Sequence, residues 1–492
     1  MDRRKPNPGA RAVLGILLLA GLALCSAADP EQPAQIERLQ QLLEDQQWEA
    51  VVTEAEAILA DNPDNAAIRA KFGLALLGKA RIEEPVLNKA KADQLEGATD
   101  PGAFFDPALF RTEVTYDDGL WSEAGKEFDK VLAQAPDNLD ARVGLASIHG
   151  RAGDYEQQRE QIRLAARAHA EDQEAGRLLL RFGEKYFASG RYDDALAIFG
   201  ILVESFGEDA TVVLDYGAAQ FATSQYDDGI ATVEKASALD PENENLHHTL
   251  AQMYIFRMYW EEAAAVYQRL AEQFPDNPMM TVQRGAALLP ESVERGREIL
   301  QKVVDADPEK SDGASTVASN LLLGLDQGNA ADLVQLADEL NARRLPHLAA
   351  TVGGVLLVRE PDNVAGRLVF AALYDGLRYF DLSLLMLRDA AKVIGEKPDS
   401  SVPFTRDDVI ASQGRTYLRM GNDRQAVQAF LSADNPQKFF LPLGLAYERL
   451  HDYRKAYDYF IQVVEGGGTG PELVRASEHL AQEEYSAFEN EP

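Results

Sequence analysis

Residues 173–206 read QEAGRLLLRFGEKYFASGRYDDALAIFGILVESF, and the same pattern returns after 34 residues and then again. Small residues recur in two registers of this pattern, and aromatic or other bulky apolar residues recur in two more. A fixed period of this length is typical of a solenoid, in which each unit buries its apolar face against its neighbours. The four registers are Gly183, Gly217, Ala251 and Gly285; Tyr192, Tyr226 and Trp260; Ala195, Gly229 and Ala263; and Phe199, Val233 and Tyr267.

Each unit is predicted to form two antiparallel helices. A glycine or alanine at the Gly183 position lets the two helices approach closely, and the bulky residues fill the space around that contact. The units end in proline, an acidic residue and asparagine, as in Pro241-Glu242-Asn243 and Pro275-Asp276-Asn277. Proline cannot continue a helix and the residues after it favour a turn, so this triplet separates successive units.

The spacing resembles the tetratricopeptide repeat, whose pattern is Leu-Gly-x-x-Tyr, then Gly-x-Tyr-x-x-Ala-x-x-x-Phe, then Pro. This chain has Phe182-Gly183-x-x-Tyr186 followed by Gly190-Arg191-Tyr192-x-x-Ala195-x-x-x-Phe199, and a C-terminal copy with Gly444-x-x-Tyr447 and Tyr453-x-x-Ala456-x-x-x-Phe460. The resemblance implies an all-α fold, a right-handed α-solenoid of about eleven or twelve helix-turn-helix repeats. It also implies that a peptide or helix of a partner protein binds in the concave groove.

The repeats are expected to form two arrays, over residues 32–310 and 346–470, with a degenerate repeat or junction at 311–345 between them. A capping helix is expected at 471–487, because a solenoid must present a polar face where it ends in water. The segment 80–118 interrupts the first array. Two degenerate repeats meeting near Pro101 are the preferred interpretation, and one repeat with an inserted loop is the alternative.

Residues 1–28 have the features of a signal peptide. Arg3, Arg4 and Lys5 precede an apolar run at 12–24, which is too short to span a bilayer comfortably, and small residues follow it. The run also resembles a bacterial lipobox ending at Cys25, which would then be lipidated, although Leu24 departs from that pattern. We expect an exported protein, periplasmic or associated with the outer membrane, either soluble or anchored by a lipid; an uncleaved anchor is the third alternative.

The composition argues against several classes of function. Asp and Glu total 80 against 48 Lys and Arg, a net charge of −32, which repels the phosphate backbone of nucleic acids. A single cysteine excludes an internal disulfide framework, and no pair of the seven histidines has metal-ligand spacing. The sequence has no glycine-rich phosphate loop and no Gly-x-Ser-x-Gly motif. We therefore predict no catalytic residues, metal or cofactor, and a chain that is not an enzyme.

Two surfaces are candidates for partner binding. The first is an apolar ladder on the first helices of the units at 176–310; the alternative is that these side chains pack between neighbouring units. The second is a basic groove on the last two units that would take an acidic segment; the alternative is ordinary pairing with nearby Asp and Glu. The ladder comprises Leu180, Phe187, Leu214, Phe221, His248, Ile255, Phe256, Met279, Val282 and Leu289, and the basic groove comprises Arg415, Arg419, Lys438 and Arg449.

Together these features predict a non-enzymatic protein–protein interaction scaffold of the bacterial cell envelope. Assembly or secretion of envelope components is the expected context. The alternative is a chaperone-like holdase, whose apolar ladder would capture exported or lipid-modified clients.

Overall fold

The computed structural model describes residues 32–87, 110–327, 329–396, 404–466, 470–485 and 488. It divides into two compact units, Met1–Thr223 and Ser224–Pro492. The division falls in the turn between helices α11 (Ala210–Ala222) and α12 (Tyr226–Leu239), which are the two helices of one repeat by sequence. The predicted signal peptide, Cys25 and Pro101 lie outside the described residues.

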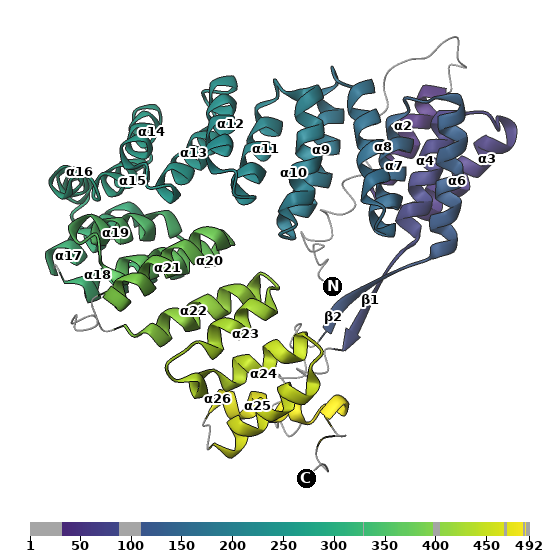
Figure 1. Cartoon of the computed structure of the whole chain (residues 1–492). Helices are drawn as coiled ribbons and strands as arrows, with labels where there is room; N and C mark the ends of the chain where they lie inside the picture. Colours follow the sequence, from purple (N-terminus) through teal and green to yellow (C-terminus); the bar gives the residue numbers. More distant parts are fainter. Residues whose placement is uncertain are drawn as a thin grey trace, which may run out of the picture. The chain divides into compact units, whose positions relative to one another are not determined.

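The first unit is a succession of helix pairs (Figure 1). In each pair the second helix packs back on the first, as the repeat pattern predicts. The elements before α11 are α2 (Gln32–Glu44), α3 (Trp48–Asp61), α4 (Ala66–Lys79), β1 (Arg81–Leu87), β2 (Phe110–Tyr116), α6 (Asp118–Gln134), α7 (Leu139–Ala152), α8 (Tyr155–Ala168), α9 (Gln173–Ala188) and α10 (Tyr192–Phe206).

Capping residues and turn residues set the limits of these helices. The side chains of Asn138 and Asp172 accept hydrogen bonds from the first-turn amides of α7 and α9, which satisfies donors that have no partner within the helix. Gly153 and Gly190 follow α7 and α9 with φ of 80° and 76°. Glycine adopts this left-handed conformation without the strain that a Cβ atom causes, so these two turns match their residues well.

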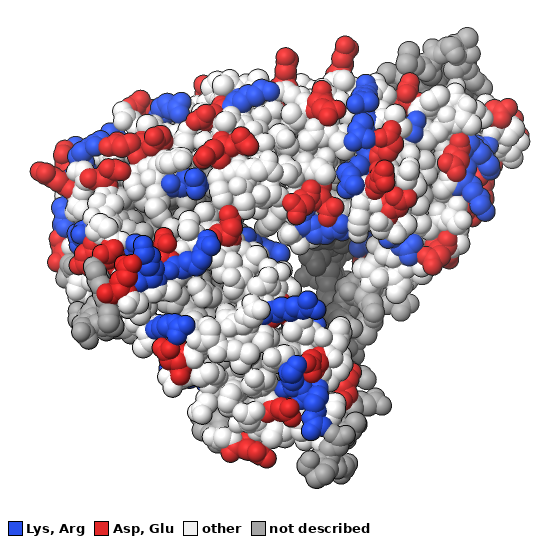
Figure 2. Space-filling view, viewed as in Figure 1, with Lys and Arg blue, Asp and Glu red and all other residues white. Residues whose placement is uncertain are grey.

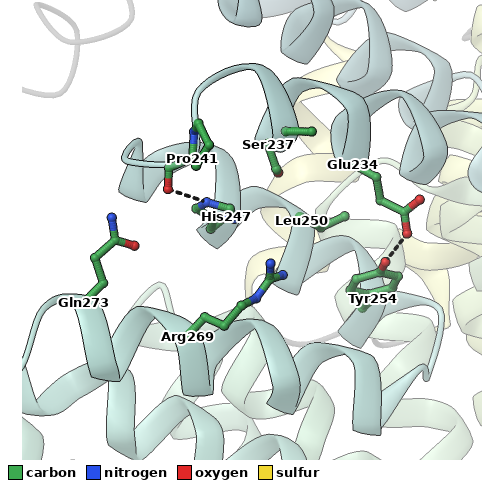
Figure 3. Close-up of a pocket in the computed structure, with 9 residues that line it drawn as sticks. Glu234, Ser237, Pro241, His247, Leu250, Tyr254, Arg269 and Gln273 are labelled. Carbon is green, nitrogen blue, oxygen red and sulfur yellow. Dashed lines mark hydrogen bonds between the residues drawn. The ribbon is translucent and has the colours of Figure 1, made fainter.

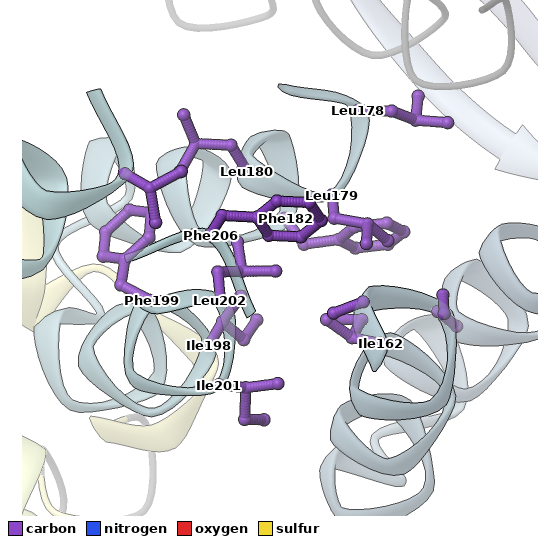
Figure 4. Packing of buried hydrophobic residues seen from close by; sticks show 14 of the residues in the cluster. Ile162, Leu178, Leu179, Leu180, Phe182, Ile198, Phe199, Ile201, Leu202 and Phe206 are labelled. Carbon is purple, nitrogen blue, oxygen red and sulfur yellow. The ribbon is translucent and has the colours of Figure 1, made fainter. Parts of the chain in front are cut away.

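The close approach between helices depends on the glycine of the repeat pattern. A Cβ atom on Gly183 would lie 2.2 Å from a ring carbon of Phe199, well inside van der Waals contact. Phe199 is 1% exposed and belongs to a continuous apolar cluster contributed by α7–α11 (Figure 4). Gly444 and Phe460 repeat the same contact in the second unit, which confirms the pairing of small and bulky registers predicted from the period.

The segment between α4 and α6 is an insertion into one repeat. β1 and β2 pair antiparallel from Arg81 with Tyr116 to Leu87 with Phe110. The two flanking helices pack on each other, and a Cβ on Gly73 of α4 would lie 2.6 Å from the ring of Phe128 on α6. A single helix pair therefore spans this region, so the preferred prediction of two degenerate repeats is wrong. The inserted segment begins and ends in a β-ribbon, which the helical period could not indicate.

The second unit continues the helix pairs to the C-terminal helix (Figure 1). After α12 its elements are α13 (Glu244–Phe256), α14 (Trp260–Gln273), α15 (Pro278–Leu288), α16 (Val293–Ala306), α17 (Gly313–Gln327), α18 (Ala330–Ala342), α19 (Pro346–Arg359), α20 (Val364–Gly376), α21 (Phe380–Glu396), α22 (Arg406–Arg419), α23 (Asp423–Leu431), the 3-10 turn η4 (Pro436–Phe439), α24 (Phe440–Arg449), α25 (Tyr453–Glu465), α26 (Pro471–Leu480) and the 3-10 turn η5 (Glu483–Tyr485).

Helix α17 breaks the alternation of first and second helices. It packs on α15 and α16, whereas α18 packs on α19 as the two helices of a repeat. The turn between α18 and α19 contains Arg344 with φ of 63°, and the turn between α20 and α21 contains Arg378 with φ of 67°. These positions are 34 residues apart and equivalent to Gly190. The degenerate segment predicted at 311–345 thus holds one single helix and the first helix of the next repeat.

Candidate functional site

The predicted apolar ladder is largely buried. Leu180 and Phe221 of the first unit and Ile255, Phe256, Val282 and Leu289 of the second are 5% exposed or less. Phe187, Leu214, His248 and Met279 are partly buried. Side chains buried to this extent cannot contact a partner without repacking the core. For the six buried residues, the prediction of an open groove is therefore wrong, and packing between neighbouring helices is correct.

In the second unit, the ladder is covered by the chain's own later helices. Helix α19 packs against α13 and α15, the first helices of the repeats where the groove was predicted. The Tyr374 hydroxyl of α20 donates to the Phe256 carbonyl at 2.6 Å, and the rings of Phe256 and Tyr379 lie 6.1 Å apart. A Cβ on Gly354 of α19 would lie 2.7 Å from the Trp260 ring. Within this unit the groove is thus occupied in cis.

A polar cluster lies inside that interface. The rings of His248 on α13 and His347 on α19 are 5.6 Å apart, and the Gln283 amide lies 3.3 Å from His347 Nε2. Burial lowers the pKa of His347 to about 3, helped by His248 beside it. The Tyr267 hydroxyl and Gln283 Oε1 have no hydrogen-bond partner among the described residues. Burial also lowers the pKa of His248. His347 is therefore neutral at pH 7, and the cluster joins helices rather than facing solvent.

The predicted basic groove is mostly engaged in ion pairs within the chain. Arg419 pairs with Asp375, and Lys438 Nζ lies 3.4 Å from the buried carboxylate of Asp407. Arg449 Nε lies 3.2 Å from Asp423, and its guanidinium also donates to the Leu418 carbonyl. Arg415 donates to Ser412 at 3.0 Å. Of the four, Arg415 lines a cleft that the sequence did not point to.

This cleft occupies the registers of the predicted ladder, continued into later repeats. The ladder used positions ten and three residues before the turn residue, as Leu180 and Phe187 stand to Gly190. The position ten before the turn and the one six before it line the cleft on α18, α20 and α22, and the position three before the turn lines it on α20. The cleft has a volume of about 470 Å³. The same registers, extended to the repeats after α17, predict the position of this cleft. The lining residues in these registers are Val334, Leu368 and Ala411; Asp338, Ala372 and Arg415; and Asp375.

The cleft, which we call the α18–α22 cleft, has an apolar floor and a charged rim. Leu387 and Val369 are buried beneath it, and Leu368 and Phe404 are partly buried at its surface. Ala372 also lines the cleft and is exposed. Its small side chain leaves space in the cleft. Each apolar side chain that a ligand covers fully would contribute about 1.5–3 kcal/mol before ordering entropy is subtracted.

Acidic groups predominate at its rim. Asp338, Asp375 and Asp408 line the cleft together with one cation, Arg415. Burial raises the pKa of Asp338. Asp408 accepts from the Thr405 amide and hydroxyl at 2.7 Å, which caps α22. Asp375 pairs with Arg419 through one oxygen, while its other oxygen has no partner among the described residues.

A second cleft lies beside α12, α13 and α14, with a volume of about 510 Å³ (Figure 3). Most of its polar groups already have partners. The Tyr254 hydroxyl donates to Glu234, and the imidazole of His247 hydrogen-bonds to the Pro241 carbonyl at 2.9 Å. Arg269 extends toward the same space from α14. Because carboxylate, guanidinium and imidazole are mixed here, the cleft favours no single class of ligand.

Neither unit shows a concentrated field of one sign on the visible face. Lys and Arg side chains are interspersed with Asp and Glu over the surface (Figure 2). No group of three His, Cys, Asp or Glu residues in the described part of the chain could hold a metal ion. Within the same residues, no helix has the length and apolar character needed to cross a bilayer.

Comparison with known proteins identifies the repeats. The tetratricopeptide repeat model matches residues 115–172 and 180–244, which include α6–α8 and most of α9–α12. No curated protein matches the chain.

Among solved structures, the chain is similar to MamA protein, at 16% identity over 35% of this chain and 93% of that one, with a TM-score of 0.28. YrrB, described as a TPR protein with an unusual peptide-binding site, is 15% identical over 40% and 98%, with a TM-score of 0.29. A tetratricopeptide repeat protein from Parabacteroides merdae is 11% identical over 56% and 98%, with a TM-score of 0.30.

The matched residues contain the glycine–aromatic contacts and left-handed turns described above. The helix pairs continue with the same geometry on both sides of them. Residues 115–172 and 180–244 thus consist of tetratricopeptide repeats.

Proposed function

We propose that this chain is a non-enzymatic scaffold that binds an extended segment of a partner protein in the α18–α22 cleft. The tetratricopeptide repeat fold itself implies protein–protein interaction. The observation that supports this location is that the first-helix registers are covered on α13 and α15 but line an open cleft on α18, α20 and α22. The open stretch offers apolar contacts to a partner without unfolding of the core.

We further propose that the scaffold acts in the bacterial cell envelope, in assembly or secretion of envelope components. This rests on the features of an export signal in residues 1–28. The alternative role as a holdase depended on an exposed apolar ladder. Since six residues of that ladder are buried, no feature of the described residues favours the alternative.

The proposal is tested by filling the cleft. Ala372 is exposed within it, so Ala372→Trp places a large ring in the cleft with little cost to folding. Ala265→Trp on α14 is the matched control, because Ala265 is also an exposed helical alanine but does not line the cleft. Peptides selected from a random 12-residue library on the full-length protein, labelled and measured by fluorescence anisotropy, are the probe.

We expect Ala372→Trp to weaken the selected peptides at least about tenfold, equivalent to 1.4 kcal/mol, and Ala265→Trp to leave them unchanged. Circular dichroism of both variants should match that of the wild-type protein. If binding survives Ala372→Trp, or if both variants lose it equally, the cleft is not the binding site.

A further inference from the structure

We infer that the α18–α22 cleft selects segments in which a lysine or arginine stands next to an apolar residue. This inference rests on the proposed function, since it names the chemistry of the segment bound there. It differs from the acidic ligand expected from the sequence, because three of the four cations that suggested an acidic ligand are held by the chain's own carboxylates.

The first argument is charge complementarity. Three carboxylates and one guanidinium line the cleft. Arg419, which is not among the lining residues, offsets the charge of Asp375, so the rim keeps an excess of one negative charge. Asp338 has no cationic partner among the described residues, and desolvation alone accounts for its raised pKa. Asp338 is exposed at the rim, and a carboxylate without a counter-ion is stabilised by a cation brought close to it.

The second argument comes from Asp375. Its pairing with Arg419 uses one carboxylate oxygen, and the other is shielded from solvent and has no hydrogen-bond donor among the described residues. A buried acceptor without a donor costs about 1–3 kcal/mol. Carboxylates rotate readily about their terminal torsion, so a donor entering the cleft could satisfy this oxygen. Ammonium and guanidinium groups are the side-chain donors that also carry positive charge.

The third argument is the position of the apolar surface. On α18, Val334 stands four residues before Asp338. On α20, Leu368 stands four residues before Ala372 and seven residues before Asp375. Side chains four residues apart share one face of a helix. Each of α18 and α20 therefore presents an apolar side chain and a carboxylate toward the same cleft. A segment with neighbouring apolar and basic side chains matches both.

The test uses a charge exchange between peptide and protein. From the peptides that require an open cleft, one is synthesised with its basic residue replaced by glutamate. We expect this replacement to weaken binding to the wild-type protein about tenfold, because it sets like charges together. Asp338→Lys should restore binding of the glutamate peptide and weaken the original one. Glu339→Lys is the matched control, because Glu339 is exposed on the same helix but does not line the cleft, and it should restore nothing.

The outcomes separate this inference from the proposed function. If cleft-dependent peptides carry no basic residue, or if the glutamate peptide binds wild type as well as the original, the inference is overturned while the cleft remains a binding site. Equal rescue by Glu339→Lys would also overturn it, because the effect would then be one of net charge. If no selected peptide is sensitive to Ala372→Trp, the proposed function fails and this inference fails with it.

Discussion

Replacing Gly183 by alanine tests the contact that holds each helix pair together. The added Cβ would lie 2.2, 2.6 and 2.7 Å from three carbons of the Phe199 ring, whereas ordinary contacts begin near 3.4 Å. The ring would have to move by about 1 Å, yet Phe199 is enclosed by the apolar cluster of α7–α11. Overpacking of this kind costs about 1–3 kcal/mol, and the better helix propensity of alanine returns about 0.5–1 kcal/mol. The middle values of these two ranges give a net loss of about 1 kcal/mol.

Gly200→Ala is the matched control. Gly200 lies within α10, and a Cβ there would meet nothing closer than Tyr216 at 3.5 Å. This variant should gain about 0.5–1 kcal/mol. Repeat arrays do not always unfold in one step, so urea unfolding followed by circular dichroism should be combined with hydrogen exchange of the α9 and α10 amides.

The contact between Gly183 and Phe199 also predicts how a double variant behaves. Leucine at position 199 removes the ring atoms that the new Cβ would meet, so Gly183→Ala should cost less in a Phe199→Leu background than in the wild type. If Gly183→Ala is as stable as the wild type while Gly200→Ala gains stability, the close approach does not explain the glycine register.

Three other predictions concern charge and backbone conformation. Burial lowers the pKa of His347 to about 3, so below pH 6.5 the unfolded chain binds a proton that the folded chain does not. The second unit should then lose up to about 1.4 kcal/mol per pH unit on acidification in urea unfolding, and His347→Gln should flatten this dependence. Burial and two neighbouring carboxylates raise the pKa of Asp215 to about 7, so the folded state holds the extra proton there between about pH 4 and 7. Asp215→Asn should stabilise the first unit by about 1–3 kcal/mol at pH 8 and not at pH 4; equal effects at both pH values would contradict this. Arg344 has a left-handed backbone conformation, so Arg344→Gly should raise the free energy of unfolding by about 1 kcal/mol. Arg343 has φ of −79°, so Arg343→Gly should lower the free energy of unfolding.

Most of the fold could be predicted from the 34-residue period. It predicted the helix pairs and the glycine–aromatic contact, because in a solenoid these depend on residues within one repeat or its neighbour. The turns of α18–α19 and α20–α21 were harder to recognise, since arginine stands at the left-handed positions 344 and 378 where Gly190 marks the turn after α9. The β-ribbon before α6 gave no signal in a helical period.

The candidate site was predicted only as far as its registers. Those registers do lie on one face of the first helices. Whether a partner can reach that face depends on contacts between repeats that are far apart in sequence. Helix α17 has no partner in the alternation, and α19 then packs on α13 and α15. Local pattern contains no information on such packing. Val334 and Leu368, which stand in the register of Leu180, line the open cleft farther along the chain.

Hydrogen exchange of the protein with and without a bound peptide tests most directly the central claim, which is that a partner segment binds in the α18–α22 cleft. The full-length protein would be compared free and saturated with a cleft-dependent peptide. We predict new protection of amides in α18, α20 and α22, and unchanged exchange in α13, α15 and α19. Protection of α13 and α15 together with faster exchange of α19 would show instead that the segment displaces the chain's own helix, and would contradict the account.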